Sequence, residues 1–185
     1  YTTISLDDLA HHLVTGYPLP PKPIILTFDD GYADHFTHAF PLLSQYHFTG
    51  TFFVVTRFLD EGKAGYLTWE QARSMQAKGM DIEAHGRTHV EMRGLGADAL
   101  RWQMQGAREA IESKLERPVH FFAYPAGRYD QAAVDALRSA GYWGAVTTEY
   151  GAEHTWAGLF TLKRVRVHGG SDLEPFIAMC MACAR

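Results

Sequence analysis

Short apolar runs alternate along this chain with longer segments in which apolar residues recur every three or four positions. These runs, together with other segments that carry strand signals, predict strands over residues 24–28, 51–55, 80–84, 119–124, 144–148 and 162–167. The periodic segments predict helices over about residues 34–46, from 68 onwards, over about 98–116, from 130 to about 141, and from 171 onwards. Strands that are separated by helices indicate parallel β/α units.

The first 23 residues depart from this pattern. An amphipathic stretch after Ser5 and before Gly16 predicts a short helix, with Ser5 as its N-cap. Residues 17–23 read YPLPPKP, a Pro-rich linker that cannot continue a helix and is expected to be extended. We therefore expect a helix and linker over residues 1–23, followed by a single α/β domain over residues 24–185. Six or seven β/α units favour a closed or nearly closed barrel over a doubly wound sheet.

Composition narrows the classes of function. Of the 185 residues 46% are hydrophobic and 13% aromatic, which is enough to bury the core of one domain. The formal net charge is −4 with the signs interspersed, which argues against a nucleic-acid partner. No apolar stretch reaches the roughly 18 residues that a transmembrane helix needs. We expect a monomer.

Polar groups directly follow four of the expected strands. They are Asp29 and Asp30 after the first strand, His85 and His89 after the third, residues 124–127 after the fourth, and His168 after the sixth. The carboxyl ends of parallel strands in a barrel meet at one rim, where barrel enzymes build their active sites. These groups are therefore expected to converge.

The spacing of His85 and His89 is H-x-x-x-H, which places two imidazoles on one face if the segment is helical. Two imidazoles and one carboxylate suit Zn²⁺, or another borderline divalent ion, with a position left for water. One residue of the pair Asp29 and Asp30 can then ligate the cation, while the other accepts a proton from that water. Two alternatives stay open. The histidines can be unrelated surface residues, and Asp30-Gly31 can be an ordinary turn with Asp29 as a helix cap.

The sequence TFDDG at residues 27–31, together with His85-x-x-x-His89, resembles the first two motifs of the polysaccharide deacetylases of carbohydrate esterase family 4. The resemblance covers nearly the whole chain. It implies a distorted (β/α)7 barrel and metal-dependent removal of acetyl groups from the N-acetylglucosamine units of a polysaccharide. By position, it makes Asp29 the general base. Asp30, His85 and His89 become ligands of one divalent metal ion, Zn²⁺ first, with Co²⁺ or Ni²⁺ as alternatives.

The family's third motif, R-x-P-Y-G, is altered in this chain to AYPAG at residues 123–127. The family uses the backbone N–H at the Tyr position as an oxyanion donor, and the resemblance gives this part to Ala126. The family's Arg, which tunes the aspartate base, is replaced by Ala123, so that role is not assigned to any residue of this chain. The altered motif is similar to that of the subgroup that acts on poly-β-1,6-N-acetylglucosamine, a polymer of biofilms.

The family's last motif, L-x-H, provides a general acid for the departing amine. His168, at the end of the sixth expected strand, is similar to that histidine, and His154 is a second candidate. The alternative for His168 is a loop histidine before a Gly-Gly turn. Tyr124, Tyr129 and Trp156 are expected to offer ring faces to sugar units, although aromatic residues in strands also serve as core.

These inferences predict a metal-dependent N-deacetylase whose partner is a polysaccharide that contains N-acetylglucosamine, with poly-β-1,6-N-acetylglucosamine preferred. Peptidoglycan and chitin oligomers are alternative substrates. A carbohydrate-binding domain without catalysis is an alternative of another class, motivated by the lost Arg of the third motif. The polymer substrate implies an extracellular or cell-surface location.

Overall fold

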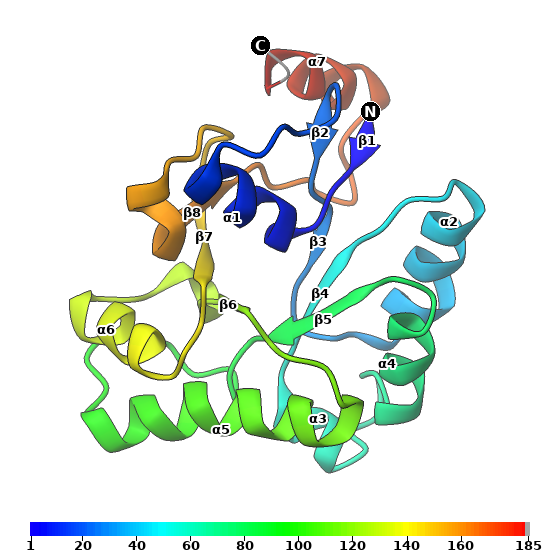
Figure 1. Cartoon of the computed structure of the whole chain (residues 1–185). Helices are drawn as coiled ribbons and strands as arrows, with labels where there is room; N and C mark the ends of the chain where they lie inside the picture. The colour runs from blue at the N-terminus through cyan, green and yellow to red at the C-terminus, as the bar shows by residue number, and fades with distance from the viewer. Residues whose placement is uncertain (184–185) are drawn as a thin grey trace.

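The computed structural model describes residues 1–183, which form an α/β domain around a curled parallel sheet (Figure 1). The six strands pair in chain order: β3 (Thr27–Phe28), β4 (Thr51–Val54), β5 (Asp81–Ala84), β6 (Phe121–Ala123), β7 (Gly144–Tyr150) and β8 (Leu162–Arg164). The curled sheet is a half-barrel, so the expected single domain with a distorted (β/α) barrel is confirmed. Within residues 1–183, no strand pairing joins β8 back to β3, and the barrel is open on that side.

Helices connect the strands and flank the sheet. They are α1 (Leu6–Thr15), α2 (Phe40–Gln45), α3 (Thr56–Asp60), α4 (Trp69–Gln76), α5 (Ala97–Leu115), α6 (Gln131–Ser139) and α7 (Leu173–Cys183), with shorter turns η1 (His35–Ala39), η2 (Pro125–Gly127) and η3 (Trp156–Thr161). Capping residues set several of the boundaries. Ser5 and Thr68 form capping boxes at the starts of α1 and α4, and Asp130 caps α6. Gly16, in the left-handed region with φ 76°, ends α1 as expected.

Two expected elements differ from the structure. The apolar run over residues 24–28 is divided, because β2 (Pro23–Ile24) pairs with β1 (Thr2–Thr3) in a separate two-stranded sheet. The helix expected over residues 34–46 begins as the π-helical turn η1. Pro41 has no N–H for the α-helical bond, so the hydrogen bonding shifts and the N–H of Phe40 reaches the carbonyl of His35.

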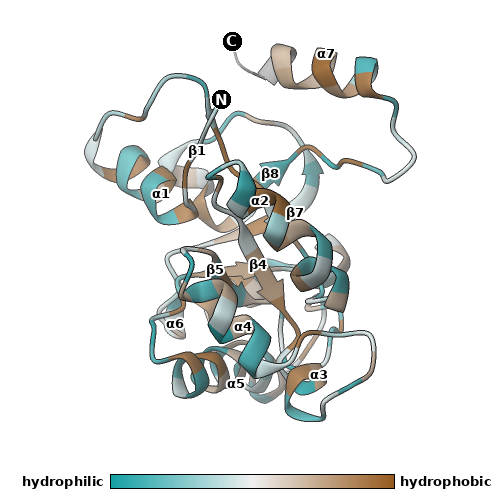
Figure 2. Cartoon of the chain, turned by 90° about the vertical axis from the view of Figure 1, so that its right-hand side faces the viewer, coloured by the Kyte–Doolittle hydropathy of each residue, from teal (hydrophilic) through white to brown (hydrophobic). Residues whose placement is uncertain are grey.

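Both faces of the sheet are buried. Along β4, Phe52 and Val54 belong to the larger core on the side of the helices, whereas Phe53 belongs to a second core. That second core also takes in apolar side chains of the N-terminal segment, namely Ile4, Leu6, Leu9 and Ala10. Figure 2 shows apolar colour along β4 and hydrophilic colour along much of α4. A sheet covered on both faces explains why strands such as β4 and β6 are almost entirely apolar.

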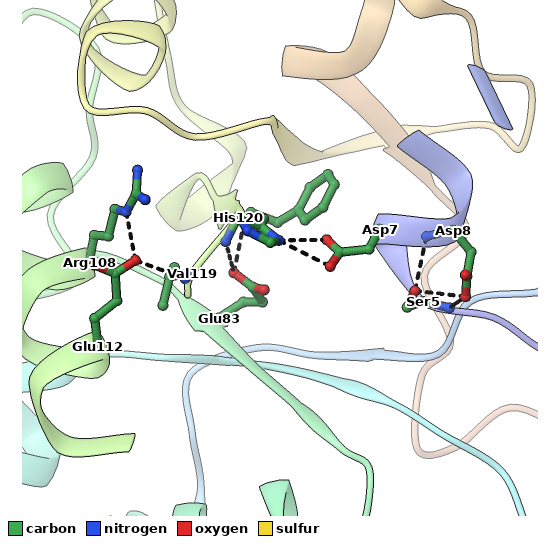
Figure 3. Close-up of polar contacts among 9 residues, drawn as sticks. Ser5, Asp7, Asp8, Glu83, Arg108, Glu112, Val119 and His120 are labelled. Atoms are coloured by element: carbon green, nitrogen blue, oxygen red, sulfur yellow. Dashed lines mark hydrogen bonds and ion pairs between the residues drawn. The ribbon is translucent and has the colours of Figure 1, made fainter. Parts of the chain in front are cut away.

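Polar contacts fix α1 against the start of β6 (Figure 3). Asp7 on α1 accepts a hydrogen bond of 3.0 Å from Nδ1 of His120, and Trp143 stacks on the same imidazole with ring centroids 3.6 Å apart. Glu83 on β5 accepts the backbone N–H groups of His120 and Phe121 at 3.0 and 2.8 Å. The N-terminal helix is therefore packed on the barrel and does not stand free of it.

The last helix, α7, lies apart from the other helices in both Figure 1 and Figure 2. It exposes apolar side chains, among them Leu173 and Met181. None of the helices in residues 1–183 is long and apolar enough to cross a membrane.

Candidate active site and metal centre

Asp30, His85 and His89 lie together past the carboxyl ends of β3 and β5. Oδ1 of Asp30 is 3.2 Å from Nε2 of His85 and 3.0 Å from Nε2 of His89. One ligand atom from each of the three residues lies within 4.8 Å of the others. Two imidazole nitrogens and a carboxylate oxygen that are about 2 Å from a common point would lie at such separations. The donor set therefore fits one divalent cation.

The segment from His85 to His89 is not helical, so helical spacing is not what brings the two imidazoles together, and that part of the expectation is wrong. Gly86 and His89 both lie in the left-handed region, with φ of 81° and 60°. Gln103 on α5 holds the loop instead, because its side-chain oxygen accepts two successive backbone N–H groups at 2.8 and 3.2 Å. A Cβ at Gly86 would stand 3.2 Å from that same oxygen. Glycine thus lets the loop approach α5 and bring the two imidazoles together.

His85 is prepared to ligate through Nε2. The residue is 2% exposed, and its Nδ1 lies 2.7 Å from the carbonyl oxygen of Ala123. A carbonyl only accepts, so Nδ1 carries a proton, and Nε2 is left to face Asp30 and to ligate a metal. Hydrogen bonds from both histidines hold the pKa of Asp30 well below its usual range. The hydrogen bond to Asp30 in turn raises the pKa of His89.

Asp29 has a different partner, Arg164 at the end of β8. Nη1 and Nη2 of Arg164 donate to Oδ1 and Oδ2 of Asp29 at 2.8 and 2.7 Å. Nη1 also donates to the hydroxyl of Thr27, and Nε donates to the carbonyl of Thr147 at 2.8 Å. Burial alone would raise the pKa of Asp29, but the hydrogen bonds and charge of Arg164 outweigh it and lower the pKa. Two neighbouring aspartates thus stand in separate settings, one beside imidazoles and one beside a guanidinium.

The sequence reasoning missed Arg164. The available signal was a charged residue inside the strand expected over residues 162–167, because a charge close to a buried strand requires a partner of opposite sign. That partner, Asp29, is 135 residues away along the chain, and only the curl of the sheet brings the two together.

Ala126 lies in η2, directly after β6. Its φ is 54°, a conformation that costs a residue with a Cβ roughly 1–2 kcal/mol, so the surrounding loop must hold it there. Gly127, also left-handed, donates its N–H to the carbonyl of Tyr124 at 2.8 Å. Ala126 borders an open cleft of about 540 Å³, which is also lined by Arg93, Arg128, Tyr129 and Glu149.

The aromatic candidates are placed differently from one another. Tyr124 is 1% exposed, and its hydroxyl donates to the carbonyl of Phe160, so its ring is part of the core. Tyr129 stacks on it, with ring centroids 4.5 Å apart, and lines the cleft. Trp156, at the start of η3, is 64% exposed.

The two histidines considered as proton donors lie outside this cluster. His168 is exposed beyond β8, and its backbone carbonyl accepts the N–H of Ser171 at 2.9 Å. His154 is half-buried in the loop after β7, and burial lowers its pKa. In the described part of the chain, no hydrogen bond or ion pair links either side chain to Asp29 or Asp30.

Comparisons with a family model and with known proteins both find polysaccharide deacetylases. The family model described as "Polysaccharide deacetylase" matches residues 16–145. YxkH of Bacillus subtilis (strain 168), a candidate polysaccharide deacetylase, is 31% identical over 176 residues, which make up 95% of this chain and 62% of that protein. The poly-β-1,6-N-acetyl-D-glucosamine N-deacetylase of Escherichia coli (strain K12) is 24% identical in an alignment of 218 positions, which covers 95% of this chain and 32% of that protein. This chain thus spans less than two thirds of either relative.

Among solved structures, the Streptococcus pyogenes deacetylase PplD, determined in complex with acetate, superposes with a TM-score of 0.90. Its sequence is 27% identical, and the match covers 96% of this chain and 79% of that chain. The fold of this chain is therefore found in a protein of known structure.

Proposed function

This chain belongs to the polysaccharide deacetylase family, and on that premise we propose that it hydrolyses the N-acetyl groups of poly-β-1,6-N-acetylglucosamine with one bound divalent metal ion, Zn²⁺ first. One observation carries the proposal. Asp29 and Asp30 are adjacent in sequence, yet Arg164 binds the first and two imidazoles face the second. This is the division of labour that a base and a metal ligand require.

In the proposed chemistry, the side chains of Asp30, His85 and His89 would hold the cation. Such an ion polarises the acetyl carbonyl and makes a water molecule more acidic. Asp29 takes the proton from the attacking water, because the hydrogen bonds from Arg164 keep its carboxylate ionised and oriented.

Two further groups complete the proposed reaction. The backbone N–H of Ala126 donates to the oxyanion as the tetrahedral carbon forms. His168 gives a proton to the departing amine, which leaves glucosamine and acetate. His168 is exposed at the start of the segment that leads to α7. Its proposed role as proton donor therefore requires its side chain to approach Asp29 when the polymer binds.

The substrate is proposed on two grounds. The altered third motif is similar to that of the β-1,6 subgroup, and a relative matched over 95% of this chain is named for that substrate. Peptidoglycan and chitin oligomers are the alternative substrates, and a carbohydrate-binding domain without catalysis is the alternative function. The proposed substrate is a surface polymer of biofilms, so the proposed location is extracellular or at the cell surface.

The test is acetate release from three substrates: poly-β-1,6-N-acetylglucosamine oligomers, chitin oligomers and peptidoglycan. Each is assayed with Zn²⁺, Co²⁺ or Ni²⁺ and after chelation. We expect metal-dependent release that is fastest on the β-1,6 oligomers. Faster release from a β-1,4-linked polymer would contradict the substrate, and polymer binding without release from any of them would favour the binding-domain alternative.

A further inference from the structure

Three aromatic rings form a row beside Asp30. Tyr32 follows Asp30 by two residues, and its ring centroid is 5.2 Å from that of Tyr66, with an interplanar angle of 27°. The ring of Tyr66 lies in turn 4.5 Å from that of Phe58. Tyr32, at the end of the row, is 43% exposed.

Backbone contacts hold this row in place. Tyr32 and Tyr66 form an isolated antiparallel bridge, flanked by hydrogen bonds of 2.9 Å from Ala33 to Gly65 and 2.8 Å from Leu67 to Gly31. The loop after Asp30 and the loop after α3 are thereby joined into one unit. A surface that is ordered before its ligand arrives loses less entropy on binding.

Lys63 adds a positive charge to the same row. Its Nζ lies 3.8 Å from the ring centroid of Phe58 and 4.7 Å from that of Tyr66, so one ammonium group covers both rings. Its three N–H groups are potential hydrogen-bond donors beside Tyr66, the ring that stacks on Tyr32.

Core packing does not account for this arrangement, because Tyr32 and Lys63 are exposed. The combination of an aromatic surface with a few polar donors is typical of a site that binds an amphipathic ligand. A pyranose ring is such a ligand, with C–H groups on its faces and hydroxyl and acetamido oxygens at its edge. Because the row lies next to Asp30, we expect the pyranose ring that binds there to belong to the polymer substrate.

We propose that Tyr32, Tyr66 and Lys63 form a subsite for a sugar unit that neighbours the one from which acetyl is removed. The unit stacks on Tyr32, at the open end of the row, and the ammonium of Lys63 donates to its hydroxyl or acetamido oxygens. This inference rests on the proposed function, because it takes the occupant to be part of the same polymer.

The experiment compares the metal-loaded full chain with its Tyr32→Ala, Tyr66→Ala and Lys63→Gln variants. The matched control is Tyr46→Ala, since Tyr46 is 62% exposed and follows α2, outside the row. Binding of a β-1,6-linked N-acetylglucosamine hexamer is titrated directly, together with binding of the N-acetylglucosamine monomer and of Zn²⁺. Acetate release from the hexamer is measured in parallel.

We expect the two tyrosine variants to bind the hexamer about threefold to tenfold more weakly, with Zn²⁺ and monomer binding unchanged. Lys63→Gln should weaken hexamer binding in the same direction, and Tyr46→Ala should have no effect. Equal hexamer affinity in the wild type and in all three variants would overturn the subsite, as would a wild type that binds no hexamer. Variant-dependent binding without any acetate release would uphold the subsite and refute the proposed function, so the two failures are distinguishable.

Discussion

Arg164 holds Asp29 through two parallel hydrogen bonds of 2.8 and 2.7 Å. Asp29 follows the first strand of the curled sheet and Arg164 ends the last, so their pairing spans the side on which the strands do not pair. A bidentate guanidinium fixes the orientation of a carboxylate as well as its charge. Arg164 therefore supplies what Ala123 cannot, a cation that lowers the pKa of the proposed base.

Replacing Arg164 should move the pH dependence of the reaction. A general base acts when it is ionised, and without Arg164 burial would raise the pKa of Asp29. We therefore expect Arg164→Ala to shift the acidic limb of the kcat/KM profile to higher pH and to lower the rate at neutral pH. Arg164→Lys keeps the charge but loses the paired geometry, so it should restore only part of the rate.

The control for this experiment is Arg166→Ala, because Arg166 is an exposed arginine two residues further on. Its profile should match that of the wild type. Arg164→Ala should also lower the free energy of unfolding by about 1–3 kcal/mol, since partners in the first strand and in β7 lose their donor. An unshifted acidic limb in a folded Arg164→Ala protein would show that Arg164 does not tune Asp29.

Metal binding should depend on the two histidines unequally at low pH. His89 is 38% exposed and its pKa is raised by Asp30, whereas His85 is buried and held by a backbone carbonyl. A proton on His89 competes with the metal, so Zn²⁺ affinity should fall as the pH drops through the raised pKa of His89.

Calorimetric titration of Zn²⁺ between pH 5 and 8 measures this effect, with the number of protons released as a second readout. His89→Ala should weaken binding by more than about 100-fold, because loss of a ligand exceeds the effect of losing a supporting contact. Exposed His38 provides the control substitution. Unchanged Zn²⁺ affinity in His89→Ala would refute the assigned ligand set.

Gly127 should not tolerate a side chain. Its φ is 66°, and a Cβ there would meet Thr148, with the Cβ of that threonine only 2.9 Å away. Gly127→Ala should lower the free energy of unfolding by about 2 kcal/mol or more through backbone strain and overpacking. It should also lower acetate release by displacing the N–H of Ala126.

Urea unfolding and activity assays check this expectation. The double variant Gly127→Ala/Thr148→Ala removes part of the clash and should recover part of the stability. A Gly127→Ala protein with wild-type stability and activity would show that the loop is more adaptable than its contacts indicate.

Asp81 should make the protein less stable at neutral pH than an uncharged residue would. Burial, together with the charge of Asp7, raises the pKa of Asp81 from 3.8 to about 6. A carboxyl whose pKa is raised on folding contributes stability below its unfolded pKa, and that stability is lost as the pH rises through the folded value. Asp81→Asn should therefore stabilise the protein at pH 7 by on the order of 1 kcal/mol, and the gain should vanish below about pH 4.

Thermal or urea unfolding of both proteins between pH 3.5 and 7.5 measures the effect. Asp135→Asn, on the exposed face of α6, provides the control. A stabilisation by Asp81→Asn that does not vary with pH would show that ionisation of Asp81 is not its cause.

The sequence predicted what local pattern determines. Both faces of the sheet are buried, so strands such as β4 and β6 appear as apolar runs. The caps at Ser5, Thr68 and Asp130 mark helix starts. What it could not predict depends on distant contacts. The approach of His85 to His89 relies on a non-helical loop that α5 holds, and the partner of Asp29 lies at the other end of the sheet.

The most direct test of the account is to measure Zn²⁺ affinity and acetate release in Asp29→Asn alongside the wild type. Asp29 is assigned to proton transfer and not to the metal, so Zn²⁺ affinity should be preserved while release from the β-1,6 hexamer falls by about 100-fold or more. Chelation of the wild type should abolish release, and added Zn²⁺ should restore it. An Asp29→Asn protein that releases acetate at the wild-type rate, or a chelated wild type that remains active, would contradict the account.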